Sequence, residues 1–374
     1  MQHISSLYFT VLSISLPMMM ATSFENRTAE VGLSGVANDS SVFADYDNDG
    51  DPDLFAGALW RNDGGVFTLV SSPLSGRGLF ADFDNDGLLD FYSFAGSPMV
   101  YMQDLSEADG WRAASYLPSP PMTISQGAAI ADFNGDSFLD VYVGGYEANL
   151  HDYQKDGMWF GNGDGTFNLV WIEPYDPWGW NLPGRGVTAC DFDEDGDVDI
   201  YVSNYRLERN YLWVNDGNGN LTDYADSYNV DGIPDYYINS YGHTIGSSWG
   251  DMNNDGHFDL FVGNFSHSWD ATQDLPFFMG NDIFSSGSFT DYSATAGLAW
   301  QESYASPNLV DVDNDASIDL FFTTVYAGDY PVLYQNDGGF AFHDVTAASG
   351  LSYVTETYQN AWADIDLDGD QDLM

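Results

Sequence analysis

The sequence contains few basic residues and a single cysteine. Among 374 residues, Lys and Arg total 8 and Asp and Glu total 58, so the formal net charge is −50. Such an acidic protein lacks a basic face, which argues against binding nucleic acid or docking electrostatically on an anionic membrane. Cys190 has no second cysteine to pair with, which excludes an intrachain disulfide, so any cross-linking must come from metal ions. Cys190 lies in an apolar strand pattern and is interpreted as a small buried residue.

Long apolar runs are also scarce. Residues 7–21 form a short apolar run, and small residues around Ala21-Thr-Ser23 follow it. This pattern is typical of a secretory signal peptide, whereas a run of this length is marginal for a membrane span. The sequence therefore predicts a signal peptide over residues 1–22, one domain over residues 23–374, and a secreted or cell-surface protein without a membrane span.

What the sequence does contain is one acidic loop in seven copies. The copies begin at residues 45, 82, 132, 191, 251, 311 and 364, and each has Asp or Asn at positions 1, 3, 5 and 9. Oxygen ligands at this spacing, with the backbone carbonyl of position 7, suit Ca²⁺, which takes about six to eight oxygens. Mg²⁺ fits less well because it keeps its waters. The loops predict about seven Ca²⁺ sites; the alternative is a set of solvated acidic turns.

The predicted calcium ligands are the residues at positions 1, 3, 5, 7 and 9 of each loop: Asp45, Asp47, Asp49, Asp51, Asp53, Asp82, Asp84, Asp86, Leu88, Asp90, Asp132, Asn134, Asp136, Phe138, Asp140, Asp191, Asp193, Asp195, Asp197, Asp199, Asp251, Asn253, Asp255, His257, Asp259, Asp311, Asp313, Asp315, Ser317, Asp319, Asp364, Asp366, Asp368, Asp370 and Asp372. Copies three and six have Ser137 and Ala316 instead of Gly at position 6, and copies three and five have Asn at position 3. Those sites are expected to bind Ca²⁺ more weakly.

Short apolar runs flank the loops. In the first copy residues 42–44 precede the loop and residues 54–56 follow it, and later copies repeat this pattern. Such runs predict strands, so each loop connects a hairpin; an EF-hand would need helical flanks. A third run ending in an Asn-Asp-Gly turn and a fourth run complete the unit. Repeated four-stranded antiparallel units predict an all-β fold, a seven-bladed β-propeller with calcium loops.

The N-terminal part of the predicted domain suggests how the ring closes. Residues 24–33 match the fourth-strand segments 289–298 and 342–351 but precede the first loop. In a ring they can complete the last blade and cover its edge. The chain ends at Met374, two residues after Asp372, so the seventh blade is expected to be truncated at the C-terminus and to lack at least two strands.

The loops and the linkers of the form Phe-x-Asp-x-Thr-Ala-x-x-Gly-Leu resemble FG-GAP/VCBS repeats over about residues 24–374. Such repeats form the calcium-bearing propeller of integrin α subunits and of many secreted bacterial proteins. The amino-acid sequence of these linkers is most similar to that of the ASPIC/UnbV-associated subgroup. The resemblance implies a structural role for calcium and a ligand face opposite the metals, but a fold does not define a ligand.

Long insertions away from the loops supply the candidate ligand-binding residues. They combine aromatic rings with cationic and imidazole groups that suit sugars or protein surfaces. The candidates are Trp178, Trp180, Arg206, Arg209, Tyr236, Tyr237, Tyr241, His267 and Trp269. The alternative is that these side chains only pack between blades.

Two common enzyme motifs are missing from the sequence: it has no His-Glu-x-x-His and no phosphate loop. No catalytic residue is therefore assigned. The sequence favours a secreted, calcium-stabilised binding or adhesion module, part of a larger extracellular protein, with a protein or glycan ligand. The alternatives are a carbohydrate-active enzyme of the polysaccharide lyase type and a structural spacer.

Overall fold

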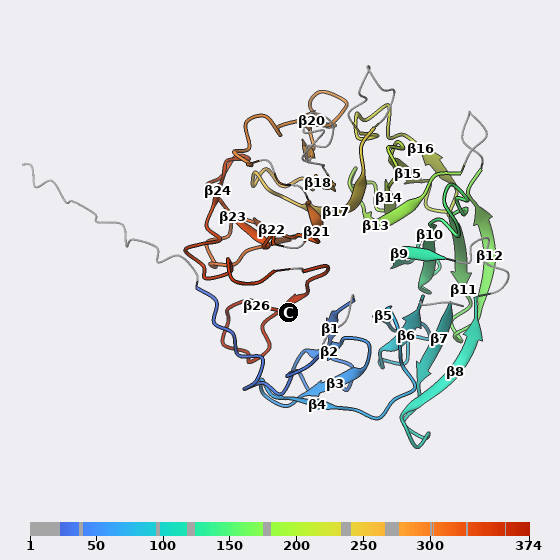
Figure 1. Cartoon of the computed structure of the whole chain (residues 1–374). Helices are drawn as coiled ribbons and strands as arrows, with labels where there is room; N and C mark the ends of the chain where they lie inside the picture. Colours follow the sequence, from blue (N-terminus) through green and yellow to red (C-terminus); the bar gives the residue numbers. More distant parts are fainter. Residues whose placement is uncertain are drawn as a thin grey trace, which may run out of the picture.

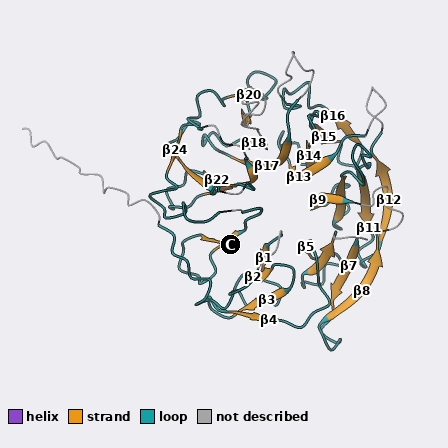
Figure 2. Cartoon of the chain, viewed as in Figure 1, coloured by secondary structure: helices purple, strands orange, loops and turns teal. Residues whose placement is uncertain are grey.

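The computed structural model describes residues 23–36, 40–94, 98–117, 124–174, 181–232, 241–265, 277–299, 301, 303–326, 328–355 and 357–374. These residues form strands joined by loops and turns (Figure 2). The part of the chain that is described contains no helix with the length and apolar character that crossing a membrane requires.

The strands form antiparallel sheets in sequence order. Blades 1 to 3 comprise β1 (Val42–Ala44), β2 (Asp53–Phe55), β3 (Leu59–Asn62) and β4 (Phe67–Leu69); β5 (Gly78–Ala81), β6 (Asp90–Ser93), β7 (Met99–Gln103) and β8 (Trp111–Tyr116); β9 (Ser125–Ala131), β10 (Asp140–Gly145), β11 (Gly157–Gly161) and β12 (Phe167–Ile172).

Blades 4 to 6 and the seventh unit follow in the same way. They comprise β13 (Gly184–Cys190), β14 (Asp199–Asn204), β15 (Tyr211–Asn215) and β16 (Leu221–Asp223); β17 (Thr244–Gly250), β18 (Asp259–Asn264), β19 (Phe277–Gly280) and β20 (Thr290–Asp291); β21 (Ala305–Val310), β22 (Asp319–Thr323), β23 (Val332–Asn336) and β24 (Phe342–Asp344); and β25 (Trp362–Ala363) with β26 (Asp372–Leu373).

The sheets stand around a central axis as the blades of a propeller (Figure 1). The first strand of each blade lies nearest the axis and the fourth lies at the rim. The prediction of four-stranded antiparallel blades is confirmed in six units, whereas the seventh unit has two strands among the described residues. The two-stranded unit lies next to blade 1.

The hydrophobic core lies between neighbouring blades. The second strand of a blade is buried along its whole length, as in β10, β14 and β18. Its alternating side chains face the blades on either side, so one cluster joins Tyr92 of blade 2 to Val141 and Trp159 of blade 3. Alternation along a strand explains why these runs are apolar without interruption, since both faces of the sheet are covered.

A buried asparagine at the end of the third strand ties each of several blades to the blade before it. Asn215 Nδ2 donates to Phe133 O (2.8 Å), and Asn281 and Asn336 donate in the same way to Phe192 O and Met252 O. Asn62 Nδ2 of blade 1 donates to Ile365 O of the seventh unit (2.8 Å). The seventh unit is therefore bound to blade 1 by the same contact that joins the blades in mid-chain.

Replacement of this tether is expected to weaken the ring. Asn215 Nδ2 also donates to Val198 O, and Asn215 Oδ1 accepts from Gly219 N, so Asn215→Ala removes three hydrogen bonds at a site 3% exposed. We expect a loss of about 3 kcal/mol in the free energy of unfolding, because buried backbone groups are left unsatisfied. Urea denaturation measures it. Asn218→Ala in the same turn is the control, since Asn218 is exposed; equal losses in both variants would contradict the tether.

Residues 24–33 lie beside the seventh unit that they are predicted to complete. The described residues 23–36 contain turns and no strand. A fourth strand needs a third strand to pair with, and the described seventh unit provides only β25 and β26. The segment still lies between the seventh unit and blade 1, since the Phe24 ring is 5.7 Å from that of Trp362 and Phe67 N donates to Val31 O (2.8 Å). Completion of the blade by this segment stays a prediction.

Candidate functional site

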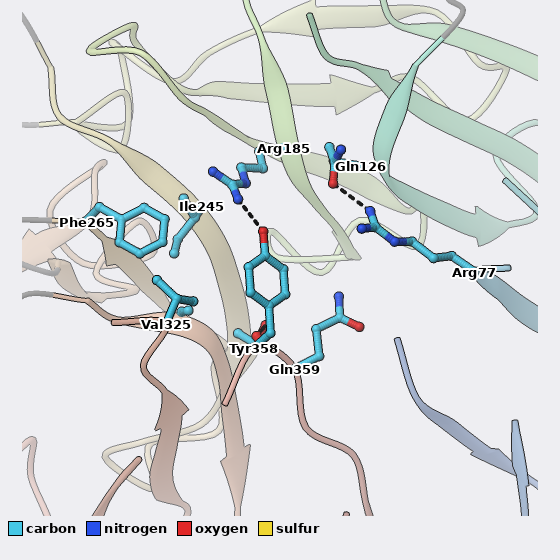
Figure 3. Close-up of a pocket in the computed structure, with 10 residues that line it drawn as sticks. Arg77, Gln126, Arg185, Ile245, Phe265, Val325, Tyr358 and Gln359 are labelled. Atoms are coloured by element: carbon cyan, nitrogen blue, oxygen red, sulfur yellow. Dashed lines mark hydrogen bonds between the residues drawn. The ribbon is translucent and has the colours of Figure 1, made fainter. Parts of the chain in front are cut away.

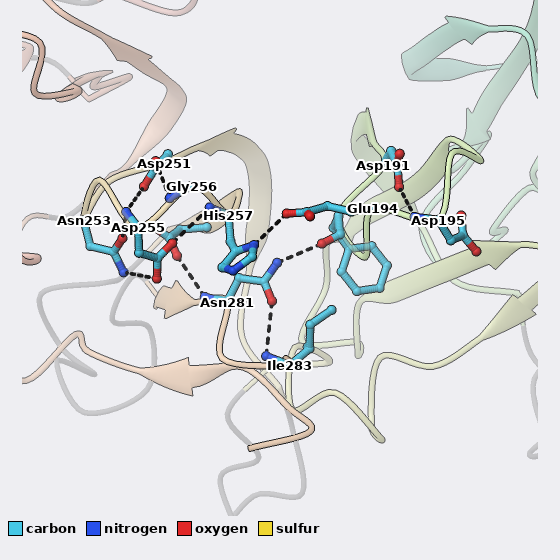
Figure 4. A network of polar contacts seen from close by, with 12 residues as sticks. Asp191, Glu194, Asp195, Asp251, Asn253, Asp255, Gly256, His257, Asn281 and Ile283 are labelled. Atoms are coloured by element: carbon cyan, nitrogen blue, oxygen red, sulfur yellow. Dashed lines mark hydrogen bonds and ion pairs between the residues drawn. The ribbon is translucent and has the colours of Figure 1, made fainter. Parts of the chain in front are cut away.

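The seven acidic loops join the first strand of each unit to the second. In the loop between β17 and β18, Asp251 Oδ1 accepts from Asp255 N (3.0 Å) and Asp251 Oδ2 from Gly256 N (2.9 Å), as Figure 4 shows. Asp255 Oδ1 accepts from His257 N (3.0 Å). The same three bonds recur in all seven loops, including those with Ser137 and Ala316. The sequence thus folds each loop into one preformed turn.

The carboxylate at position 9 has a structural role that the spacing does not reveal. Asp259 is fully buried, and its two oxygens accept from Met252 N and from Asn281 N (both 2.8 Å). It therefore connects its loop to the end of the third strand. The same two bonds hold Asp53, Asp90, Asp140 and Asp319. Burial raises the pKa of the Asp259 carboxyl to about 7.

The donor sets of the loops fit a hard divalent cation. Oxygens of Asp191, Asp193 and Asp199 lie within 4.8 Å of one another, and four other loops hold similar groups of three carboxylates. The Oδ1 atoms of Asp84, Asp193 and Asp313 at position 3 are buried without a hydrogen-bond partner among the described residues. Burial, and then repulsion from the carboxylate at position 5, raises the pKa of each of these three groups. A bound cation would satisfy the oxygens and neutralise the charge.

Position 4 of the loop also links neighbouring blades. Asn48 and Asn85 adopt a left-handed backbone (φ 59° for both), which Asn tolerates better than most residues. Their Nδ2 atoms donate to position 6 of the next loop, at Gly87 O and Ser137 O. In blade 4 the equivalent Glu194 accepts instead from the His257 imidazole (2.6 Å), a bond that raises the pKa of His257. These hydrogen bonds between loops were not predicted from the sequence, because the residue at position 4 is not a metal ligand.

Only part of the predicted ligand surface lies in the described residues. Trp178, Trp180, Tyr236, Tyr237, His267 and Trp269 lie outside them. Arg206 pairs with Glu147 of blade 3. Arg209 pairs with Asp223 Oδ2 of the outer strand β16 (2.5 Å) and lies 4.8 Å from the Tyr211 ring centre. Tyr241 N donates to Leu207 O (3.0 Å). The two arginines thus belong to different clusters, one between blades and one toward the rim of blade 4.

The repeat pattern also matches a known family. The family profile of the FG-GAP-like repeat matches residues 82–143, 132–202 and 191–262. Each matched segment begins at the first Asp of one acidic loop and ends in the second strand of the next blade. The chain is an FG-GAP repeat propeller. Its membership of the ASPIC/UnbV-associated subgroup stays a prediction. No curated protein matches this propeller in sequence.

Solved structures that are similar to this chain are distant in sequence. A lectin from Agrocybe aegerita, described as recognising non-reducing terminal N-acetylglucosamine, has 17% identity, covers 85% of this chain and 83% of its own, and has a TM-score of 0.51. A protein from Lactobacillus plantarum has 14% identity, with coverage of 80% and 81% and a TM-score of 0.46. The Photorhabdus luminescens Tc holotoxin pore has 16% identity and a TM-score of 0.39, and the match covers 88% of this propeller but 16% of the toxin chain.

The structure reveals aromatic residues of the propeller that sequence analysis did not select. Tyr146, Tyr205 and Phe265 directly follow the second strands of blades 3, 4 and 5. Their rings form a row, with centroids 6.5 Å apart between Tyr146 and Tyr205 and 6.1 Å apart between Tyr205 and Phe265. Each lies 14 residues after the first Asp of its loop, at the opposite end of the blade. That constant spacing is the signal that could have identified them.

Proposed function

We propose that this propeller is a secreted or cell-surface binding or adhesion module whose ring is stabilised by calcium. The observation that supports it best is the contrast between the two ends of the blades. One end repeats the same acidic turn seven times, as a scaffold requires. The other end presents different aromatic and basic side chains in different blades, as recognition of a particular ligand requires.

The calcium part of the proposal rests on the donor sets. Position 1, 3, 5 and 9 side chains and the position 7 carbonyl are all oxygen donors, which favours Ca²⁺ over transition metals. Each ion would neutralise a loop with three or four carboxylates, and several loops are bonded to the next loop through position 4. Calcium would thereby stabilise the ring as well as single turns. Extracellular calcium is high enough to fill weak loops, which agrees with the proposed secretion.

The ligand part of the proposal rests on Tyr146 and Tyr205, the partly exposed members of the aromatic row, since Phe265 is buried. Aromatic faces bind sugar rings and apolar side chains well. The Agrocybe aegerita lectin recognises a sugar, but at 17% identity the likeness concerns the fold, so the proposed glycan or protein ligand depends on the row itself.

A carbohydrate-active enzyme of the lyase type is the second candidate. The His243 ring lies 5.0 Å from the Tyr205 ring, and the Arg185 guanidinium lies 4.8 Å from the same ring. A lyase needs a base and a group that neutralises a carboxylate in one place, and these two side chains have that chemistry.

Binding of the purified protein to an array of acidic and neutral glycans, with calcium and with EDTA, tests the proposal. We expect calcium-dependent retention of a small set of glycans with their structure unchanged. Release of unsaturated, ultraviolet-absorbing products would favour the lyase instead. Absence of binding to glycans and to cell surfaces in calcium would contradict the binding module.

A further inference from the structure

A pocket, which we call the channel mouth, opens where the first strands of the blades begin, at one end of the propeller axis (Figure 3). It has a volume of about 50 Å³ and is lined by side chains from blades 2 to 6 and from the segment before β25. The residues important here are Arg77, Gln126, Arg185, Phe265, Ser306 and Tyr358. The described residues that line it include the guanidinium of Arg185 and no carboxylate.

Arg185 is held in the pocket by neutral groups. Its guanidinium carbon lies 4.8 Å from the ring centre of Tyr205, 5.8 Å from that of Tyr146 and 5.6 Å from that of Phe265. Its Nη2 donates to Tyr358 Oη (2.5 Å), a residue 173 positions away in the sequence. Aromatic faces restrict the orientation of the guanidinium but do not neutralise its charge, so an anion would complete the site.

The opposite sides of the pocket are also fixed by hydrogen bonds. Tyr358 O accepts from Ser306 Oγ (2.9 Å) and from Thr323 Oγ1 (3.0 Å), which positions the exposed Tyr358 ring. Ser306 has a left-handed backbone (φ 40°), a costly conformation for serine that is often found at binding sites. Arg77 Nη1 donates to Gln126 Oε1 (2.6 Å) across two blades. The cationic groups are thus held in place before any ligand binds.

We propose that the channel mouth binds a small carboxylate, with Arg185 as its anchor and Tyr358 and Arg77 beside it. The inference rests on the proposed binding function and names the chemistry that this function would recognise. A carboxylate pairs with the planar N–H donors of a guanidinium, and a sugar ring attached to it would lie against the nearby aromatic faces. The carboxylate is carried either by the terminal acidic sugar of a glycan or by a free organic acid.

The small volume of the pocket admits the end of a ligand chain but not its interior. A volume of about 50 Å³ holds roughly three to five waters, at about 10–15 Å³ each, which matches a carboxylate and a few atoms around it. An internal stretch of a polysaccharide would have to cross the channel mouth, whereas a chain end or a small acid can enter it.

The acidic loops do not prevent this binding. Arg185 and Asp191 stand at opposite ends of β13, six residues apart, or about 20 Å at roughly 3.3 Å per residue. That is more than two Debye lengths, each about 8 Å in physiological salt. Calcium in the loops would further reduce their charge.

Calorimetric titration with D-glucuronate and D-glucose tests the proposal, because the two sugars differ in the carboxylate that replaces the terminal CH₂OH group. We expect glucuronate to bind and glucose to bind at least about tenfold more weakly. Arg185→Gln should weaken glucuronate binding about tenfold or more. Arg112→Gln should not, since Arg112 lies on the rim strand β8. Tyr358→Phe removes one hydroxyl from an exposed ring, keeps the fold and should weaken binding by a smaller factor.

The outcomes separate the two sources of the carboxylate. Binding of acetate as tight as that of glucuronate indicates a free acid, and preference for glucuronate indicates the glycan end. Equal binding of glucose and glucuronate, or unchanged glucuronate binding in Arg185→Gln, overturns the proposal. If the wild type retains glycans on an array while Arg185→Gln retains them equally, the binding function stands and the channel-mouth site is wrong.

Discussion

Removal of calcium with EDTA is expected to lower the melting temperature of this propeller by about 10 °C or more. A site occupied at 100 times its dissociation constant adds about 2.7 kcal/mol to the free energy of unfolding. Two such sites in one cooperative unit add about 5.4 kcal/mol, and at about 2 °C per kcal/mol this gives about 10 °C. More sites acting together would increase the shift, since neighbouring loops are hydrogen-bonded to each other.

Differential scanning calorimetry in calcium, in EDTA and in EDTA with excess magnesium measures this effect. Calcium added back should restore the melting temperature, and magnesium should restore less of it because it dehydrates reluctantly. The same melting temperature in calcium and in EDTA would contradict a stabilising role for the loops.

The metal-free protein should also depend on pH in a defined direction. Burial raises the pKa of Asp53, Asp90, Asp140 and Asp259 to about 7 in the folded chain, from 3.8. Between these values the folded state binds more protons than the unfolded state, so stability falls as pH rises. The change is confined to the range between the two pKa values, about pH 4 to 7. In EDTA the melting temperature should therefore be lower at pH 8 than at pH 5.

Replacement of one buried position-9 aspartate is expected to give the largest loss of any single substitution in a loop. Asp259→Ala leaves Met252 N and Asn281 N without an acceptor and removes a calcium ligand. Each buried unsatisfied group costs about 1–3 kcal/mol. We expect the free energy of unfolding to fall by about 4 kcal/mol in calcium, measured by urea denaturation.

Two further variants separate the structural role of Asp259 from its role as a ligand. Asp259→Asn keeps one acceptor oxygen, leaves the second buried N–H group without an acceptor and removes the charge. Its free energy of unfolding should therefore fall by about 1–3 kcal/mol in EDTA and by more in calcium. Asp226→Ala removes an exposed aspartate and should change stability by less than about 0.5 kcal/mol. Equal losses for Asp259→Asn in calcium and in EDTA would show that Asp259 contributes no ligand.

The fold class could be predicted from the sequence because the information is local and repeated. The spacing of Asp251, Asp255 and Asp259 lies within one turn, and the apolar runs on each side form a hairpin whatever surrounds it. The outer strand predicted for residues 24–33 depends on more than the local pattern, because a strand exists only where a partner strand offers free N–H and C=O groups.

The ligand residues show where this local information ends. Arg206 and Arg209 are three positions apart in the sequence, yet one pairs with blade 3 and the other with the outer strand of its own blade. The row of Tyr146, Tyr205 and Phe265 has a constant position in the repeat, but only the ring of blades places the three aromatic rings next to one another.

By itself the sequence determined the seven acidic turns, the antiparallel hairpins they connect and the repeated unit, since residues within a turn meet whatever the rest of the chain does. Only the tertiary structure decided the contacts between blades. Asn215 reaches Phe133 across 82 positions, and Arg185 reaches Tyr358 across 173. These contacts depend on the packing of large side chains between neighbouring sheets. That packing sets the angle of each blade. No spacing along the chain records that angle, so the channel mouth exists only in the assembled ring.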